Sequence, residues 1–225
     1  AILMIDDTTV GVMLELIQGE GGIFMQDIFQ VQRLERILKE KKLLLIIDEV
    51  QTGVYRSGNF LISQYFGIKP DIVTLAKGLA SGIPIGVMMT SLKDIFTFGD
   101  HGSTFGGNHL STTVCKAVLK ILEKYSNSGK LSENIKYFNS CLQYFTDKYP
   151  NIFLQKNGWG FMQGLVLKNE NDLSNIVNLA LKNGVLVLKS GKNIIRFLPP
   201  IIISKKEIKE GFKRFEELII NYHKI

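Results

Sequence analysis

Two short aliphatic runs, each followed by a residue that can do chemistry, constrain the fold of this chain most. Residues 43–47 lead directly into Asp48, and residues 72–75 are followed by Ala76 and then Lys77. Continuous apolar runs of this length are typical of strands buried on both faces of a parallel sheet. Such sheets bind ligands beyond the carboxyl ends of their strands. We therefore expect Asp48 and Lys77, 29 positions apart, to project into one crevice.

A carboxylate and an amine held together at such a crevice fit a pyridoxal phosphate site. A lysine amine can attach the cofactor through its aldehyde, and a carboxylate can pair with the protonated ring nitrogen. The amine must be unprotonated to attack, a state that burial beside other cations favours. Each residue also has a plainer interpretation when taken alone. An aspartate at a strand end is often a helix cap, and a lysine before a glycine is often solvated.

Three segments around these residues, DEVQTG, PDIVTLAKGLASGIPIG and HGSTFGGN, closely resemble the class III (ornithine-type) pyridoxal-phosphate aminotransferases. The resemblance runs through nearly the whole chain. It implies an α/β fold of the aspartate aminotransferase-like type (fold type I), of which this chain forms part of the large-domain sheet and a C-terminal α+β small domain. It also implies a pyridoxal 5′-phosphate cofactor and a homodimer.

The resemblance assigns roles to residues around the cofactor. It implies that Lys77 carries the cofactor and that Asp48 keeps the ring nitrogen protonated. Val50 would pack on one face of the ring, and Gln51 would hydrogen-bond toward its phenolic oxygen. Thr104 lies in a glycine-rich turn of a kind that can cradle phosphate, and the family places this threonine on the phosphate of the neighbouring subunit. Glu49 is expected to have a structural role.

The resemblance also implies how substrates are bound. Arg196, in IIRFLPPIII, would hold the α-carboxylate of glutamate or 2-oxoglutarate through two parallel hydrogen bonds, although a lone arginine at a strand end is more often a surface ion pair. Glu20, in QGEGG, matches the glutamate that can mask this arginine in the ornithine-handling branch. Ser103 would lie near the substrate.

The segment GVLVLKSGKNIIRFLPPIII resembles the branch that acts on N-acetylornithine. The expected reaction is therefore amino transfer from N-acetylornithine to 2-oxoglutarate, a step of arginine biosynthesis. Ornithine and 4-aminobutyrate aminotransferases are the alternative activities. A second class of alternative is a fragment that is inactive without an N-terminal half.

The start of the chain bears on that alternative, because by Gly11 it is already in a buried-strand pattern. In the resembled family a long N-terminal half precedes this point and supplies a phosphate-binding turn and an aromatic residue that stacks on the cofactor. We expect such a half as a partner, and an exposed apolar sheet edge in this chain without it.

The hydrophobic periodicity predicts a strand-and-helix alternation followed by a small α+β region. The chain turns polar near residues 126–130, which predicts two domains, 1–127 and 128–225. The expected strands are 12–17, 43–47, 72–75, 85–90, 164–167, 185–188 and 194–198, and the expected helices are 26–41, 60–66, 110–125, 131–149 and 205–222.

The composition argues against several other classes of function. A hydrophobic fraction of 45% with 21% charged residues is typical of a globular protein, and no apolar run approaches the roughly 20 residues that span a bilayer. Cys115 and Cys141 lack metal-ligand spacing, as do His101 and His109, so we expect no metal and a reduced, cytoplasmic location. The net charge of +6 comes from scattered lysines, which does not favour nucleic-acid binding.

Overall fold

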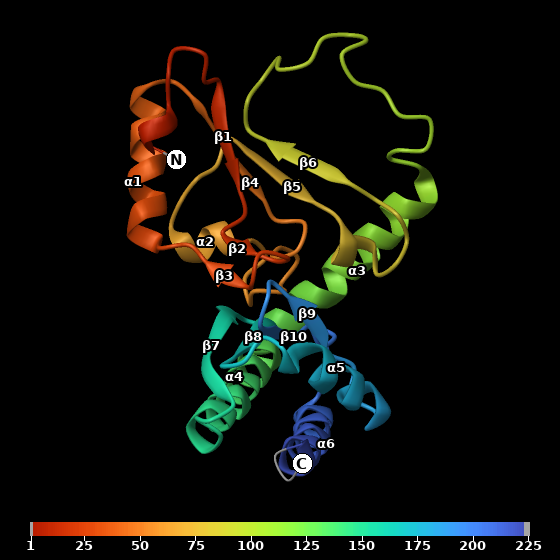
Figure 1. The fold of residues 1–225 in the computed structure, drawn as a ribbon. Coiled ribbons are helices and arrows are strands. Elements are labelled where there is room, and N and C mark those ends of the chain that lie inside the picture. Colours follow the sequence, from red (N-terminus) through yellow and green to blue (C-terminus); the bar gives the residue numbers. More distant parts are fainter. Residues whose placement is uncertain (1, 223–225) are drawn as a thin grey trace. The chain divides into compact units, whose positions relative to one another are not determined.

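The structure, a computed structural model, describes residues 2–222 of the chain (Figure 1). The chain divides into two compact units. The first contains residues 2–16 and 26–124, and the second contains residues 17–25 and 125–222. The short segment 17–25 thus belongs with the C-terminal unit, whereas the sequence predicted a single boundary between 127 and 128. Among the described residues, no helix is long and apolar enough to cross a membrane.

The first unit is built around a four-stranded sheet of order β1-β4-β5-β6. Strands β1, β4 and β5 are parallel, as the two aliphatic runs predicted, and β6 is antiparallel to β5. The elements of this unit are η1 (Ile2–Met4), β1 (Gly11–Leu14), α1 (Ile28–Glu40), β4 (Leu44–Asp48), α2 (Ile62–Phe66), β5 (Ile72–Leu75), η2 (Lys77–Ala80), β6 (Val87–Thr90) and most of α3 (His109–Asn127).

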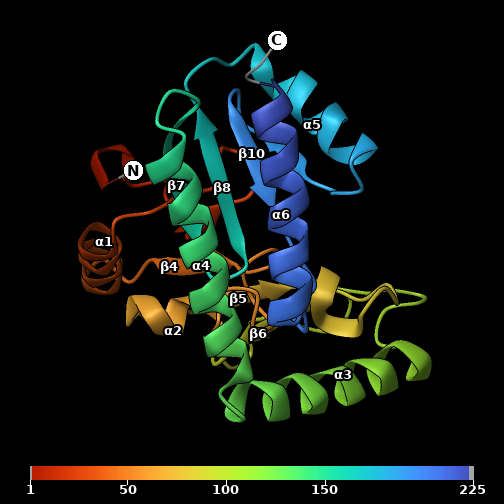
Figure 2. The same ribbon diagram turned by 90° about the horizontal axis from the view of Figure 1, so that it is seen from below.

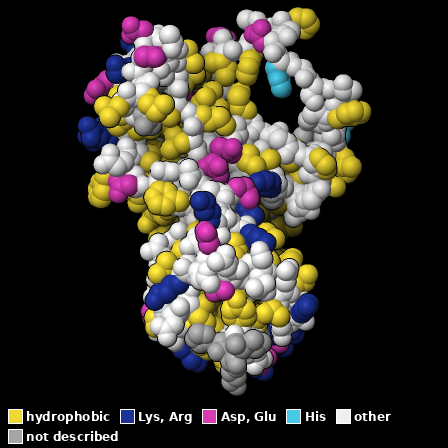
Figure 3. Space-filling view, viewed as in Figure 1, with side chains coloured by type: hydrophobic (Ala, Val, Ile, Leu, Met, Phe, Trp, Pro, Cys, Tyr) yellow, Lys and Arg dark blue, Asp and Glu magenta, His cyan; other side chains and the backbone are white. Residues whose placement is uncertain are grey.

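The two faces of this sheet are not equally covered. Leu45, Ile47, Val73 and Leu75 are buried, whereas the residues that alternate with them along β4 and β5 are only half-buried. The prediction that both faces are buried was therefore wrong. The amphipathic helix α1 packs on β4, and apolar side chains gather over the sheet region on the face seen in Figure 3.

The edges of the sheet carry exposed apolar side chains, which agrees with the expectation of an exposed apolar edge. Met13 in β1 has 58% of its surface exposed, and Met88 and Met89 in β6 are exposed to 41% and 39%. Strand β1 is also shorter than predicted, because the chain leaves the sheet after Leu14 and Ile17 enters the second unit.

The second unit contains an antiparallel sheet of order β7-β8-β10-β9. Its elements are β2 (Ile17–Gln18), β3 (Phe24–Met25), α4 (Lys130–Lys148), β7 (Phe153–Trp159), β8 (Met162–Leu167), α5 (Asp172–Lys182), β9 (Leu188–Ser190), β10 (Ile194–Phe197) and α6 (Lys205–Tyr222). The strand predicted at 185–188 lies further along, at β9. Neither β7 nor α5 was predicted.

The two faces of the second sheet are covered by different parts of the chain. Helices α4 and α6 contact each other, and both lie across the same face of the sheet (Figure 2). Phe138, Phe145 and Phe212 from these helices stack on one another, and Phe197 of β10 joins them. The β2–β3 hairpin packs against β7, and its Ile23 is fully buried. Burial of Ile23 explains why segment 17–25 belongs to this unit.

Candidate active site

Asp48 and Lys77 lie at the carboxyl ends of two adjacent parallel strands. Asp48 is the last residue of β4 and is paired with Thr74 in β5, three residues before Lys77. The Asp48 Oδ1 atom accepts hydrogen bonds from the Val50 N–H at 2.9 Å and from the Thr74 hydroxyl at 3.1 Å. Both bonds fall on the same carboxylate oxygen. Oδ2 of this half-buried side chain thus remains the atom that could accept a bond from a ligand.

Lys77 begins the short helix η2 in an unusual backbone conformation. Its φ angle is +48°, in the left-handed region that few residues other than glycine adopt. The Lys77 side chain is exposed, which differs from the buried amine that the sequence argument favoured. The space beside it is open, since a methyl group added at Gly78 or Gly82 would meet no atom of the structure within 4 Å. The strand end therefore has room for a ligand.

Glu49 has the structural role that the sequence predicted. The residue is 1% exposed, and its carboxylate accepts hydrogen bonds from the Ile62 N–H at 2.8 Å, the Ser63 N–H at 2.9 Å and the Thr52 hydroxyl at 2.9 Å. It thus satisfies backbone donors at the start of α2, where a negative charge is also favoured. Val50 and Gln51 follow in the same turn and are half-buried.

The glycine-rich turn at 101–108 precedes α3 and is exposed throughout. The Ser103 hydroxyl accepts a hydrogen bond from the Gly106 N–H at 2.8 Å, which closes the turn. Asn108 caps the helix, because its side-chain oxygen accepts from the Ser111 N–H at 3.0 Å. Thr104 is exposed on this turn.

In the second unit, Arg196 and Glu20 form an ion pair. The Arg196 Nη1 and Glu20 Oε1 atoms are 2.6 Å apart, and Nη1 also donates to the Gly19 carbonyl at 3.1 Å. Only 9% of the Arg196 side chain is exposed, compared with 72% of the Glu20 side chain. Arg196 is therefore not the surface ion pair that was its plainer interpretation. Among the described residues, its buried Nε has no hydrogen-bond partner.

Further residues hold the segment that carries Glu20, and they were not among the predicted site residues. The Ser190 hydroxyl donates to the Gly19 carbonyl at 2.8 Å and accepts from the Gly22 N–H at 3.1 Å. The Gly191 N–H donates to the Glu20 carbonyl at 3.0 Å. These contacts join positions about 170 residues apart, so no local pattern could have indicated them.

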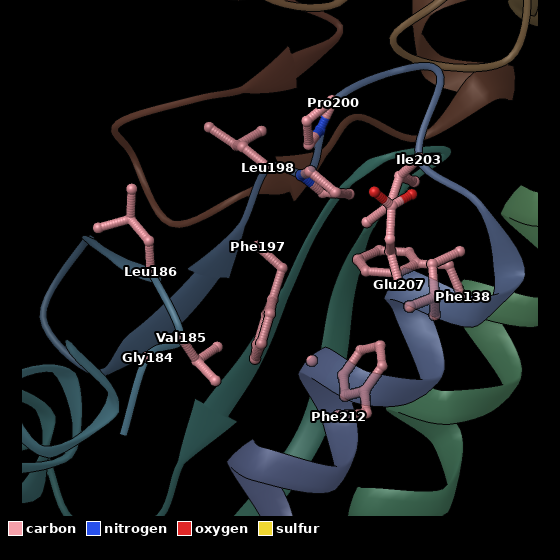
Figure 4. Close-up of a pocket in the computed structure, with 13 residues that line it drawn as sticks. Phe138, Gly184, Val185, Leu186, Phe197, Leu198, Pro200, Ile203, Glu207 and Phe212 are labelled. Carbon is pink, nitrogen blue, oxygen red and sulfur yellow. The ribbon is translucent and has the colours of Figure 1, made fainter. Parts of the chain in front are cut away.

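A cavity of about 240 Å³ lies in the second unit, on the face of its four-stranded sheet opposite the β2–β3 hairpin (Figure 4). Successive side chains of a strand point to opposite faces, so Phe197 lines this cavity while Arg196 faces the β2–β3 hairpin. The walls are mainly apolar, and the Glu207 carboxylate already accepts bonds from the backbone and hydroxyl of Ser204. The cavity therefore offers little chemistry. Nor do the described residues include a cluster of side chains that could hold a metal ion.

Comparison with known proteins identifies the family. Residues 2–219 match the family described as aminotransferase class-III. The chain belongs to the class III aminotransferases. The enzymes of this family depend on pyridoxal phosphate. The chain has the fold of the pyridoxal-phosphate enzymes of fold type I.

The most similar relatives point to one branch of the family. Acetylornithine aminotransferase from Wolinella succinogenes is 49% identical over 96% of this chain and 55% of that protein. Acetylornithine aminotransferase from Nostoc sp. is 36% identical over 95% of this chain and 51% of its own length. The chain thus spans about half the length of the curated relatives it matches.

The chain is also similar to solved structures of acetylornithine and ornithine aminotransferases. Acetylornithine aminotransferase from Elizabethkingia anophelis superposes with a TM-score of 0.86 at 28% identity, over 94% of this chain and 54% of that one. Ornithine aminotransferase from Toxoplasma gondii superposes with a TM-score of 0.85 at 29% identity, over 95% of this chain and 52% of that one.

The residues at the first unit's strand end fit the family's cofactor. Asp48 offers one carboxylate oxygen that could accept the N–H of a pyridinium ring. Lys77 offers an exposed primary amine beside glycines that leave space around it. This donor set matches what pyridoxal phosphate requires of a protein.

Proposed function

We propose that the enzyme formed with this chain transfers an amino group from N-acetylornithine to 2-oxoglutarate, as a step of arginine biosynthesis. The observation that carries the proposal is the pairing of Asp48 with Thr74, three residues before Lys77, at one edge of a parallel sheet. The names of the most similar relatives support the choice of donor. Because the chain covers about half of their length, we propose the activity for this chain together with a polypeptide equivalent to the remainder.

Lys77 and Asp48 would do the chemistry. Bound pyridoxal phosphate supplies an electron sink for the electron pair left when a proton leaves the amino-bearing carbon of the substrate. Lys77 would attach the cofactor and, when displaced by a substrate, would carry that proton as a general base and acid. Asp48 would hold the ring nitrogen protonated through Oδ2. Val50 would pack on the ring and Gln51 would bond toward its phenolic oxygen.

Arg196 would bind the substrate carboxylate and Glu20 would compete for the same guanidinium. With Glu20 on Arg196, the site would accept an ω-amino donor that has no carboxylate at that point. With Glu20 displaced, the Nη1 end of the guanidinium could instead bind the α-carboxylate of glutamate or 2-oxoglutarate. The ion pair of Glu20 with Arg196 supports this part of the proposal.

We include a homodimer in the proposal, with Thr104 reaching the phosphate site of the second copy and Ser103 lying near the substrate. The exposure of the whole turn 101–108 agrees with a role at another chain. A cytoplasmic location is part of the same proposal, in keeping with free thiols at Cys115 and Cys141.

Ornithine is the second candidate donor, because solved ornithine aminotransferases superpose on this chain as well as an acetylornithine aminotransferase does. The two candidates are separated by steady-state rate measurements with N-acetylornithine, N-succinylornithine, ornithine and 4-aminobutyrate as amino donors. We expect the largest kcat/KM for N-acetylornithine. A larger value for ornithine or 4-aminobutyrate would replace the donor, and no reaction with any of them would overturn the proposed function.

A further inference from the structure

The backbone that carries Glu20 is clamped to the second unit. Ser190, only 3% exposed, bonds to Gly19 and Gly22 on the two sides of Glu20. The Gly191 N–H holds the Glu20 carbonyl itself, and the Asn157 side chain donates to the Gly22 carbonyl at 3.3 Å. The peptide units around Glu20 thus have fixed partners on β7, β9 and the residue after β9.

Close packing supports the same clamp. A methyl group added at Gly191, where φ is +56°, would lie 3.2 Å from the Gly22 Cα atom. One added at Gly158 would lie 2.5 Å from Cγ2 of the buried Ile23. Both distances are shorter than ordinary contacts, so the sheet approaches the hairpin as closely as glycine permits.

The Glu20 side chain contrasts with its own backbone. Its exposed fraction is 72%, and its carboxylate reaches Arg196, whose side chain is only 9% exposed. If Arg196 exchanged Glu20 for a substrate carboxylate, only this exposed side chain would have to move, and the hairpin could stay in place. A tether fixed at a short distance gives Glu20 a high effective concentration at Arg196.

We propose that Ser190 is a specificity-determining positioning residue that sets this effective concentration. By fixing the backbone at Gly19 and Gly22, it lets Glu20 compete strongly with substrate carboxylates for Arg196. Loosening the clamp weakens the intramolecular competitor, while Arg196 itself stays anchored in β10. The inference rests on the proposed function, in which Arg196 receives a substrate carboxylate.

The test uses Ser190→Ala in the cofactor-loaded enzyme, with and without Glu20→Ala. The first readout is the affinity for glutarate, an unreactive dicarboxylate, measured by calorimetry. The second is the ratio of kcat/KM for glutamate to that for N-acetylornithine. We expect Ser190→Ala to tighten glutarate binding and to raise the ratio, each by about threefold to tenfold, the range of one or two hydrogen bonds. In the Glu20→Ala background the same change should have no effect.

Two further variants keep the test decisive. Asn157→Ala loosens the same hairpin through another bond and should shift both readouts in the same direction, even if Ser190→Ala does not fold. Ser63→Ala removes an equally buried hydroxyl from the first unit and should change neither readout. Equal effects of Ser190→Ala with and without Glu20, or no effect of either hairpin variant, would overturn the inference. If Glu20→Ala itself changes neither readout, the proposed role of Arg196 fails instead.

Discussion

The two candidate sites of this chain are built in opposite ways. The strand-end site of the first unit consists of residues close together in the sequence, with an exposed Lys77 and open space beside it. The Arg196 site of the second unit joins residues about 175 positions apart, and its cation is buried and already paired. In the proposed enzyme, the first site would receive a cofactor, whereas the second would choose between an internal and an external carboxylate.

This difference has a physical origin. In a parallel sheet, the register of neighbouring strands places the residues that follow them at one edge, so Asp48 and Lys77 need no further support to share that edge. A buried guanidinium must be compensated to avoid a large desolvation cost. The β2–β3 hairpin supplies that compensation through Glu20 and the Gly19 carbonyl. Changes at the first site should therefore affect catalysis, and changes at the second should affect selectivity and stability.

The largest effect is expected at Lys77. Lys77→Ala should abolish covalent attachment of the cofactor and lower turnover by at least about a thousandfold, because the group that carries the proton is lost. Absorbance of the bound cofactor and steady-state rates measure the two effects. Lys69→Ala, at another exposed lysine, is the control and should retain both cofactor attachment and turnover. Normal turnover in the Lys77 variant would contradict the assignment.

Asp48→Asn should retain the cofactor but lose about a hundredfold to a thousandfold in kcat. A neutral amide cannot hold the pyridinium proton, and comparable electrostatic losses amount to about 3–4 kcal/mol. Cofactor affinity and kcat, measured on the same preparation, separate binding from catalysis. A rate within about threefold of the unmodified enzyme would remove Asp48 from the mechanism.

Gly158→Ala tests the packing of the second site. A Cβ atom there would lie 2.2 Å from the Met162 carbonyl oxygen and 2.5 Å from Ile23 Cγ2, at a φ of +91°. Strain and overpacking together should cost about 3 kcal/mol of the free energy of unfolding. Denaturant titration measures the loss, with Gly211→Ala as the control, because a methyl group at that helical position meets no atom within 4 Å. Equal stability of the two variants would refute the close approach.

Arg196→Lys and Glu20→Ala should shift the two half-reactions in opposite directions. An ammonium cannot reproduce the two parallel hydrogen bonds of a guanidinium. Arg196→Lys should therefore weaken the binding of glutamate and 2-oxoglutarate by about tenfold. Glu20→Ala leaves Arg196 unmasked and should favour α-amino acids over the ω-amino donor by a similar factor. Separate rate measurements for each half-reaction test this, and equal shifts in both would exclude the competition.

The smallest effect is expected at Glu216, on helix α6. Its Oε1 atom accepts hydrogen bonds from Lys148, Tyr144 and Tyr149, each at 2.8 Å. Burial raises the pKa of Glu216, but these three bonds outweigh it and hold the pKa below the ordinary glutamate value. The stability that these bonds contribute is fully present above the ordinary pKa of a glutamate. It is lost as the pH falls through the lowered pKa of Glu216.

Glu216→Gln should therefore cost less than about 1 kcal/mol near neutral pH. The difference from the unmodified chain should shrink in acid, as chemical denaturation at several pH values would detect. A difference that grows as the pH falls would contradict the assigned shift.

The fold could be predicted where one hydrophobic pattern dominates. Strand β5 and helix α6 lie where the sequence placed them, because an aliphatic run and an amphipathic stripe each have one stable arrangement. Strand β7 was missed because polar residues interrupt the apolar ones in its sequence, FLQKNGW, and its pairing with β8 makes it a strand. Segment 17–25 belongs to the second unit because of contacts with residues that follow much later in the chain, which no local pattern reveals.

The candidate sites divide in the same way. Asp48 and Lys77 could be placed from local runs alone, and the ion pair of Glu20 with Arg196 was expected from the family resemblance. The exposure of Lys77 and the clamp formed by Ser190 could not be predicted, since both depend on what packs around a residue and not on its neighbours in the sequence.

The central claim is that Lys77 carries the cofactor, and reduction with borohydride tests it most directly. Borohydride would fix the attached cofactor irreversibly, and digestion followed by mass spectrometry would then locate it. We predict one modified peptide, the one that contains Lys77 and its neighbour Gly78. Modification of any other lysine, with Lys77 unmodified, would contradict the account.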